Sequence, residues 1–172
     1  DYEELPAVAD KTYNVLFVCT GNSARSILAE ALMNDLGANR GFRAFSAGSH
    51  PRGEVNPWAL KTLADHHYAT DGFRSKGWEE FAKPDAPQLD FVFTVCDQAA
   101  GEVCPVWPGQ PMTAHWGMPD PAAVEGDEAA VDRAFHDAFV TIKRRVELML
   151  ALPMDKLDRL SLHRRVSDIG TA

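Results

Sequence analysis

The feature that most constrains the fold is a short apolar run that passes directly into a helical pattern. Residues 13–18 are mostly apolar and rich in strand-forming side chains, which predicts a buried strand. The sequence CTGN at residues 19–22 turns the chain, and apolar residues at helical spacing then continue until Gly37. A strand that leads at once into a helix is half of a β-α-β unit, so we expect an α/β fold with a parallel sheet.

The alternation of strands and helices continues along the chain. The run at residues 91–95 is almost wholly apolar, which is typical of a central strand buried on both faces. Helical patterns follow residues 56–57, cover 126–150 and resume after Pro153. The remaining predicted strands lie at residues 42–46 and 111–116.

The length and composition fit one globular domain, residues 1–172, with a core at about 13–150 and a helical tail at 151–172 that we expect to pack on it. The net charge of −8 argues against a nucleic acid or an anionic membrane as the main partner. No apolar run approaches the roughly 20 residues that span a bilayer. The acidic start lacks the pattern of a secretory signal, and the three cysteines are an odd number, so we expect a cytoplasmic protein.

The turn after the first strand carries a thiol and a cation. Cys19 stands at the carboxyl end of the strand, and Arg25 opens the helix, with five residues between them. A loop that turns from a strand into a helix can aim several backbone N–H groups at one point, and ligands of open parallel sheets bind at this edge. Gly21 permits the tight turn, and the planar guanidinium of Arg25 can clamp two oxygens. The residues predicted to bind a tetrahedral oxyanion are Thr20, Gly21, Asn22, Ser23, Ala24, Arg25 and Ser26.

The same surroundings should activate the Cys19 thiol. A free thiol has a pKa near ~8.5, so only a few per cent is thiolate at neutral pH. Inward N–H groups, the helix N-terminus and Arg25 all favour the thiolate, and Ser26 could donate its hydroxyl to the sulfur. The predicted site therefore combines a nucleophile with an anion clamp.

The sequence CTGNSARS at residues 19–26 resembles the phosphate loop shared by low-molecular-weight protein tyrosine phosphatases and the arsenate reductases built on the same fold. The resemblance covers roughly residues 14–150. It includes the sequence SAG at 46–48 and the pair Asp120-Pro121, where the family carries its general acid. It implies a four-stranded parallel sheet flanked by helices on both faces.

Asp120 also suits this chemistry by itself. A hydroxide or alkoxide departs slowly unless a positioned acid protonates it, and such an acid contributes roughly 10²–10⁴-fold. An ordinary aspartate, with a pKa near ~3.9, is ionised at pH 7, so Asp120 would have to be partly desolvated or close to the bound anion. We therefore expect Asp120 to act as the general acid.

Two further cysteines separate the branches of this family. Tyrosine phosphatases usually place aromatic residues after the Asp-Pro pair, whereas Ala122 and Ala123 follow it here. Cys96 and Cys104 flank a loop rich in small residues after the strand at 91–95, and Cys96 should share its sheet edge with Cys19. The sequence AHWGMPDP at residues 114–121 is also similar to the arsenate reductases.

The resemblance implies arsenate reduction through three thiols. Cys19 attacks arsenic while Asp120 protonates the departing hydroxyl, Cys96 attacks the Cys19 sulfur to release arsenite, and Cys104 then attacks Cys96. Phosphate or sulfate would compete with arsenate. The electrons come from an external thiol reductant, either thioredoxin or glutathione with glutaredoxin. Seven residues separate Cys96 from Cys104, which departs from the pattern of the thioredoxin-coupled branch, so both reductants stay open.

Two other functions fit parts of the pattern. A phosphatase acting on phosphotyrosine or small esters would need only Cys19, Arg25 and Asp120. A non-catalytic arsenite-binding or redox-sensing protein would use the thiols but would have no use for Arg25 or Asp120. We expect no bound cofactor or metal: the six histidines show no zinc-like pairing with cysteine, and the residues Ser75, Lys76 and Gly77 stand where some family members carry an acidic ligand of potassium.

Overall fold

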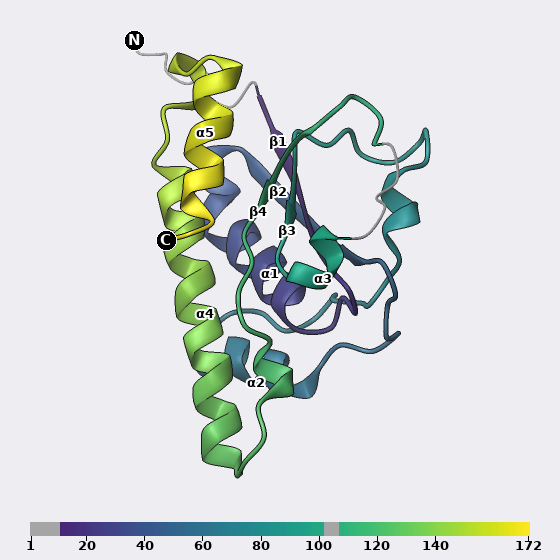
Figure 1. The fold of residues 1–172 in the computed structure, drawn as a ribbon, viewed down its shortest axis with the longest axis vertical. Coiled ribbons are helices and arrows are strands. Elements are labelled where there is room, and N and C mark those ends of the chain that lie inside the picture. Colours follow the sequence, from purple (N-terminus) through teal and green to yellow (C-terminus); the bar gives the residue numbers. More distant parts are fainter. Residues whose placement is uncertain (1–10, 102–106) are drawn as a thin grey trace.

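A four-stranded parallel sheet forms the centre of the structure, a computed structural model that describes residues 11–101 and 107–172 (Figure 1). All three strand pairings are parallel, which confirms the expected fold class. The strands follow the order β2-β1-β3-β4, so β3 is central, as predicted from its apolar sequence. Their bounds are β1 (Tyr13–Cys19), β2 (Phe42–Gly48), β3 (Phe91–Thr94) and β4 (Met112–His115).

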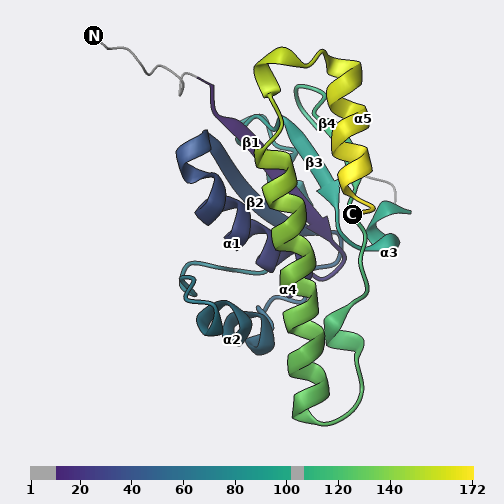
Figure 2. The same cartoon turned by 90° about the vertical axis from the view of Figure 1, so that its left-hand side faces the viewer.

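Helical segments cover both faces of this sheet. The bounds are α1 (Arg25–Gly37), η3 (Ala38–Arg40), α2 (Pro57–Asp65), η4 (Trp78–Phe81), α3 (Asp97–Ala100), η5 (Pro121–Ala123), α4 (Glu128–Leu150), η6 (Met154–Lys156) and α5 (Arg159–Ile169). Helices α1 and α4 lie side by side on one face, and α5 extends this layer beside β4 (Figure 2). The opposite face is covered near β2 by η4, where the rings of Phe45 and Phe81 lie 5.5 Å apart. No helix in the described residues is long and apolar enough to cross a membrane.

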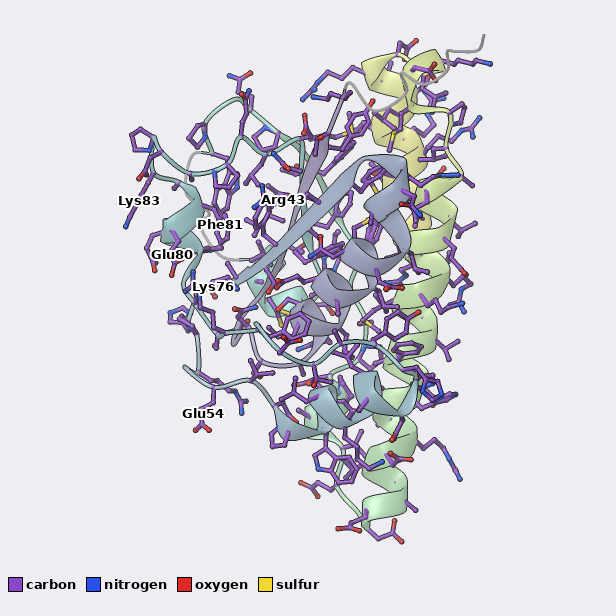
Figure 3. All side chains as sticks on the ribbon, turned by 180° about the vertical axis from the view of Figure 1, so that it is seen from behind. Arg43, Glu54, Lys76, Glu80, Phe81 and Lys83 are labelled. Carbon is purple, nitrogen blue, oxygen red and sulfur yellow. The ribbon has the colours of Figure 1, made fainter. Side chains whose placement is uncertain are left out.

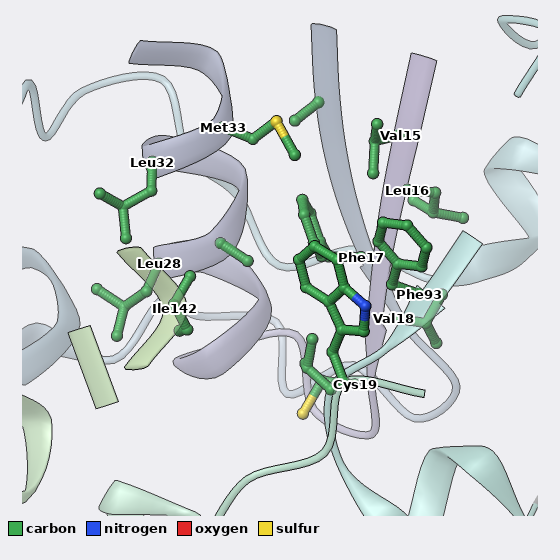
Figure 4. Close-up of a cluster of buried hydrophobic side chains, with 14 of the residues drawn as sticks. Val15, Leu16, Phe17, Val18, Cys19, Leu28, Leu32, Met33, Phe93 and Ile142 are labelled. Atoms are coloured by element: carbon green, nitrogen blue, oxygen red, sulfur yellow. The ribbon is translucent and has the colours of Figure 1, made fainter. Parts of the chain in front are cut away.

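The core lies between the sheet and the layer of α1 and α4. The rings of Phe17 and Phe93 are 5.9 Å apart, and Trp116 stacks on Phe93 at 4.3 Å. Figure 4 shows the rings of Phe17 and Phe93 in one buried cluster with Leu28 of α1 and Ile142 of α4. The burial of β1 on both faces fixes the position of its last residue, Cys19, which begins the predicted anion-binding loop at residues 19–26.

Helix α1 is buried on more than one side. Eight of its thirteen residues are buried, because α1 is enclosed by the sheet on one side and by α4 on another. Among the buried residues is Ser26, at the start of the helix. A helix held on several sides gives the loop before it a rigid support.

The C-terminal segment is tied to the chain between β4 and the expected acid. The indole of Trp116 donates a hydrogen bond of 2.8 Å to the carbonyl of Val166 on α5. The buried Arg145 of α4 donates to the carbonyls of Trp116 at 2.8 Å and Gly117 at 3.1 Å. Because Gly117 lies three residues before Asp120, this packing also orients the loop that carries Asp120.

Candidate active site

The carboxyl ends of β1 and β3 open into a cavity of about 440 Å³. This is the sheet edge at which the sequence predicted a ligand site. The lining residues come from four segments: the loop after β1, the segment after β2, the start of α3 and the loop before η5. They are Cys19, Thr20, Gly21, Ser23, Ala24, Arg25, His50, Arg52, Cys96, Asp97, Met118, Pro119, Asp120 and Ala122.

The loop from Cys19 to Arg25 is braced from outside through its carbonyl groups. The segment 49–56 runs beside it and donates backbone hydrogen bonds to four of these carbonyls. They run from Ser49 to Cys19 (3.2 Å), His50 to Thr20 (2.8 Å), Arg52 to Gly21 (3.0 Å) and Asn56 to Ser23 (2.9 Å). With these carbonyls engaged on the outer side, the opposite side of the loop faces the cavity, where N–H groups suit a tetrahedral anion.

Asn22 supports the loop rather than lining the cavity. It is fully buried, and its backbone adopts a left-handed conformation with φ of 46°. Its amide nitrogen donates to the hydroxyls of Ser26 and Ser46, both at 2.9 Å, and its amide oxygen accepts from the backbone N–H of Lys76 at 2.9 Å. The amide of Asn22 and the hydroxyl of Ser26 thus bond to each other, and the contact of the loop N–H groups with an anion stays a prediction. These three bonds hold the side chain beneath the loop.

The glycine of the SAG sequence is explained by a close approach to the same loop. A Cβ atom at Gly48 would lie 2.5 Å from the carbonyl oxygen of Thr20 and 3.0 Å from Asn22. A side chain at this position would therefore push the loop away from β2.

Arg25 and Asp120 meet at the wall of the cavity. One guanidinium nitrogen of Arg25 donates to the carbonyl of Met118 at 2.9 Å, and the other lies 3.6 Å from the Asp120 carboxylate. The Asp120 carboxylate also accepts a hydrogen bond of 2.9 Å from the N–H of Ala122, which caps η5. The structure thus brings the predicted clamp and the predicted acid together.

Cys96 lies in contact with the predicted nucleophile. The Cys96 and Cys19 side chains interact where both line the cavity, and the Thr20 hydroxyl lies 3.4 Å from the Cys96 sulfur. Both cysteines are buried and neither forms a disulfide. Cys104 falls outside the described residues. The expectation that Cys19 and Cys96 share one edge of the sheet is confirmed, because parallel neighbours β1 and β3 end side by side.

The contact between the thiols changes the ionisation expected for Cys19. The pKa of Cys96 is lowered to about 5, chiefly because the Cys19 thiol donates a hydrogen bond to the Cys96 thiolate. The same hydrogen bond, followed by burial, raises the pKa of Cys19, although Arg25 and the N–H of Thr20 act in the opposite direction. The lowered thiol pKa that was expected of Cys19 therefore belongs to the pair of thiols rather than to Cys19 alone. The two sulfurs share one proton and one negative charge at neutral pH.

Sequence reasoning missed two basic residues among those that line the cavity. His50 and Arg52 both line it, and the Arg52 side chain lies across Gly21, where it would stand 3.2 Å from a Cβ atom. Their only signal in the sequence is their place just after β2, at the edge where the other strands end. They add basic side chains next to Arg25.

His115 holds the start of the helix that follows Cys96. Its ring lies 2.7 Å from the hydroxyl of Thr94 and, through the other nitrogen, 2.7 Å from the carboxylate of Asp97. Asp97 is the first residue of α3, so the two contacts connect β3, β4 and α3. This agrees with a structural role for His115.

The assembled groups suit an oxyanion and a sulfur nucleophile, with a second thiol beside the first. In the described ranges 11–101 and 107–172, no cluster of three or more His, Cys, Asp or Glu side chains could hold a metal ion. The groups present are instead those of thiol chemistry: two adjacent sulfurs, a guanidinium and a carboxylate.

The comparisons with known proteins agree with this geometry. An arsenate reductase from Staphylococcus aureus (strain N315) is 34% identical over 115 residues, which are 66% of this chain and 82% of that protein. A solved structure described as an arsenate reductase in the phosphate binding state has a TM-score of 0.63 at 26% identity and covers 81% of this chain and 98% of its own. A low molecular weight protein tyrosine phosphatase from T. tengcongensis, at 19% identity, shares the fold with a TM-score of 0.65 over 79% of this chain and 96% of its own.

The family model for low molecular weight phosphotyrosine protein phosphatases matches residues 14–160, which include the anion loop, both described cysteines and the Asp-Pro pair. This chain is an enzyme of the low molecular weight phosphotyrosine protein phosphatase family.

Proposed function

We propose that the enzyme reduces arsenate to arsenite, with Cys19 as the nucleophile and Cys96 as the second thiol. The observation that carries this proposal is the pair of thiols, Cys19 and Cys96, that line one cavity together with Arg25 and Asp120. Hydrolysis of a phosphate ester needs one thiolate and water. A second thiol in contact with the first is what a two-electron reduction requires.

The reaction consists of two sulfur displacements. The Cys19 thiolate forms a bond to arsenic while an As–O bond breaks, and Asp120 gives a proton to the oxygen, which leaves as water. The Cys96 thiolate then forms a bond to the Cys19 sulfur, and the electron pair of the S–As bond stays on arsenic. Arsenic is reduced from the +5 to the +3 state and leaves as arsenite, while the two thiols become a disulfide.

The other residues of the site bind and orient the anion. The N–H groups of the loop and the fork of Arg25 hold the oxygens of arsenate, and phosphate or sulfate would compete for the same position. His50 and Arg52 at the mouth favour the approach of an anion to a protein whose net charge is −8.

The disulfide must be reduced before the next turnover. In the proposed relay, Cys104 attacks Cys96, so that the disulfide moves to the loop that follows β3. An external thiol, from thioredoxin or from glutathione with glutaredoxin, then supplies two electrons. We place this cycle in the cytoplasm, because it requires reduced cysteines at the start of each turnover.

A phosphatase acting on phosphotyrosine is the second candidate, because the fold is common to both branches. Among the described residues that line the cavity there is no Phe, Tyr or Trp to pack on a phenyl ring, and Ala122 lies at the mouth instead. This supports arsenate over an aryl ester. The 34% identity to a protein named arsenate reductase supports it further.

The test compares two substrates in matched serine variants. Cys96→Ser should nearly abolish single-turnover arsenite production while it spares any hydrolysis of an aryl phosphate. If thioredoxin is the reductant, Cys104→Ser should release arsenite and accumulate a Cys19–Cys96 disulfide. If glutathione is the reductant, the loss of Cys104 should reduce turnover less. Full multiple turnover by Cys96→Ser would contradict the role of the second thiol. Brisk aryl phosphatase activity without arsenite from the wild type would favour the second candidate.

A further inference from the structure

The cavity at the carboxyl ends of β1 and β3 is larger than an oxyanion requires. Its volume is about 440 Å³. Four oxygens around a central atom displace about three or four water molecules, on the order of 100 Å³. Cavities of roughly 300–1,000 Å³ typically enclose small organic molecules. The cavity therefore has room for a molecule larger than the substrate of the proposed reaction.

The disulfide that the proposed reaction forms between Cys19 and Cys96 is reached through this cavity. Both residues line it, but their exposed fractions are only 5% and 3%. Thiol–disulfide exchange requires the attacking sulfur to contact one of the two sulfurs of the disulfide. The cysteine of a protein donor is carried on a surface much wider than this cavity, whereas a small thiol fits inside it. Direct reduction of this disulfide thus favours a small thiol.

One cation that lines the cavity has no partner of its own. The Arg25 guanidinium lies 3.6 Å from the Asp120 carboxylate, and the Asp97 carboxylate lies 2.7 Å from the His115 ring. By contrast, the exposed side chain of Arg52 makes no hydrogen bond or ion pair with the residues that the structure describes. An arginine fork binds a carboxylate through two parallel hydrogen bonds. Arg52 is therefore available for a carboxylate that the ligand brings.

The backbone holds Arg52 next to the anion loop. Its N–H donates a hydrogen bond of 3.0 Å to the carbonyl of Gly21, and its Cγ and Nε atoms would lie 3.2 Å from a Cβ atom at Gly21. The Cα atoms of Gly21 and Cys19 are at most about 7 Å apart, because two residues separate them along the chain. One small molecule can therefore contact the Arg52 side chain and the sulfurs at the same time.

We propose that the cavity also binds the electron donor, a small thiol that carries a carboxylate, and that Arg52 binds this carboxylate while the sulfur of the donor attacks the disulfide. The proposal rests on the proposed function, because that reaction forms the disulfide. It assigns the donor a binding residue and makes Arg52 a determinant of donor specificity.

The exchange consists of two displacements. The donor thiolate forms a bond to the Cys96 sulfur, the bond between Cys96 and Cys19 breaks, and the Cys19 thiolate leaves. A second donor thiolate then attacks the sulfur of the first donor, which releases the Cys96 thiolate and a disulfide of two donor molecules. Two donor thiols are oxidised, and the protein gains two electrons. Of the two protons that the donors give up, one returns to the pair of protein sulfurs and the other goes to the solvent.

The test follows the reduction of a disulfide that is made without arsenate. In a Cys104→Ser parent protein, diamide oxidises the two remaining thiols, and mass spectrometry confirms the bond between Cys19 and Cys96. The second-order rate constant of reduction is then measured with glutathione, which has two carboxylates, and with glutathione diethyl ester, in which both are blocked. At matched thiolate concentrations, glutathione should react roughly tenfold faster than the ester, which corresponds to about 1.4 kcal/mol.

Variants of Arg52 show whether this ratio of rates depends on the guanidinium. In Arg52→Met the ratio should fall to about one, because the variant lacks the fork that binds a carboxylate. Arg52→Lys keeps a charge without the fork, so its ratio should lie between these values. Lys83→Met is the matched control: it removes an exposed lysine that does not line the cavity and points outward in Figure 3, and it should keep the ratio of the parent protein.

Four results would overturn the proposal: a ratio near one in the parent protein, a ratio in Arg52→Met within twofold of the parent value, an equal loss in Lys83→Met, or reduction by thioredoxin but not by glutathione. If the ratios behave as expected but arsenate yields no arsenite, the proposed function fails and the role of Arg52 stands. If arsenite forms but the ratio in the parent protein is near one, only the role of Arg52 fails. If the two thiols form no disulfide, both proposals fail.

Discussion

The hydrogen bond between Cys19 and Cys96 predicts the pH at which the site becomes reactive. In the wild type the pKa of Cys96 is about 5, because Cys19 donates a hydrogen bond to its thiolate. In Cys96→Ala this partner is lost, and Cys19 keeps burial, which raises its pKa, against Arg25 and the N–H of Thr20, which lower it. We therefore expect the first thiol ionisation to move up from about 5, towards the ~8.5 of a free thiol.

The size of the effect at neutral pH follows from these two limits. A group with a pKa of about 5 is roughly 99% ionised at pH 7, whereas a free thiol with a pKa of ~8.5 is roughly 3% ionised. The thiolate population at pH 7 should therefore fall by up to about 30-fold in Cys96→Ala. Arg25 and the loop N–H groups make the observed loss smaller than this limit.

The assay is the rate of iodoacetamide alkylation as a function of pH, in buffer free of phosphate and arsenate, with the labelled thiol identified by peptide mapping. Thr20→Val is the matched control: it removes the hydroxyl that lies 3.4 Å from the Cys96 sulfur but keeps both thiols, so its inflection should rise by less. If the inflection of Cys96→Ala stays at about 5, then the loop and Arg25, rather than the second thiol, stabilise the negative charge, and our account of the pair is wrong.

Three other variants test the surroundings of the site. Arg25→Lys replaces a planar fork with a point charge, so phosphate affinity measured by calorimetry should fall roughly tenfold; an unchanged affinity would remove Arg25 from the site. Gly48→Ala places a Cβ 2.5 Å from the Thr20 carbonyl oxygen and should lower the free energy of unfolding in urea by about 1–3 kcal/mol, together with phosphate affinity. Wild-type values would mean that the loop can move off β2. Arg145→Met loses the 2.8 Å bond to the Trp116 carbonyl and should destabilise the protein by about 2–4 kcal/mol and speed proteolysis of the C-terminal segment. Unchanged proteolysis would contradict that link.

The parts of the site that sequence reasoning predicted depend on local structure. Cys19 and Arg25 are separated by five residues, and a strand end, a turn and a helix start leave few ways to arrange them. The position of Cys96 followed from topology, because parallel strands end at the same edge of a sheet. Asp120 was expected from its family motif, and its contact with Arg25 at 3.6 Å agrees with that expectation.

Other properties of the site could not be predicted in this way. That the two thiols touch, and therefore share one charge, depends on the packing of β3 and α3 against β1. Asn22 is of a residue type that is common in turns, but its side chain is buried and makes three hydrogen bonds. The pKa of a thiol and the direction of an amide are both set by atoms that lie far away in the chain.

The sequence by itself determined the order of strands and helices and the residue types at the anion loop, because hydrophobic periodicity and turn chemistry act over a few neighbouring residues. Only the tertiary structure decided which side chains support that loop. Glu30, Ser46 and Lys76 come from a helix, a strand and an irregular segment, and their spacing in the sequence does not predict that they meet. A lysine in the printed sequence is by default an exposed cation, and it becomes an internal one only when the folded chain encloses it and supplies a carboxylate and a carbonyl within reach.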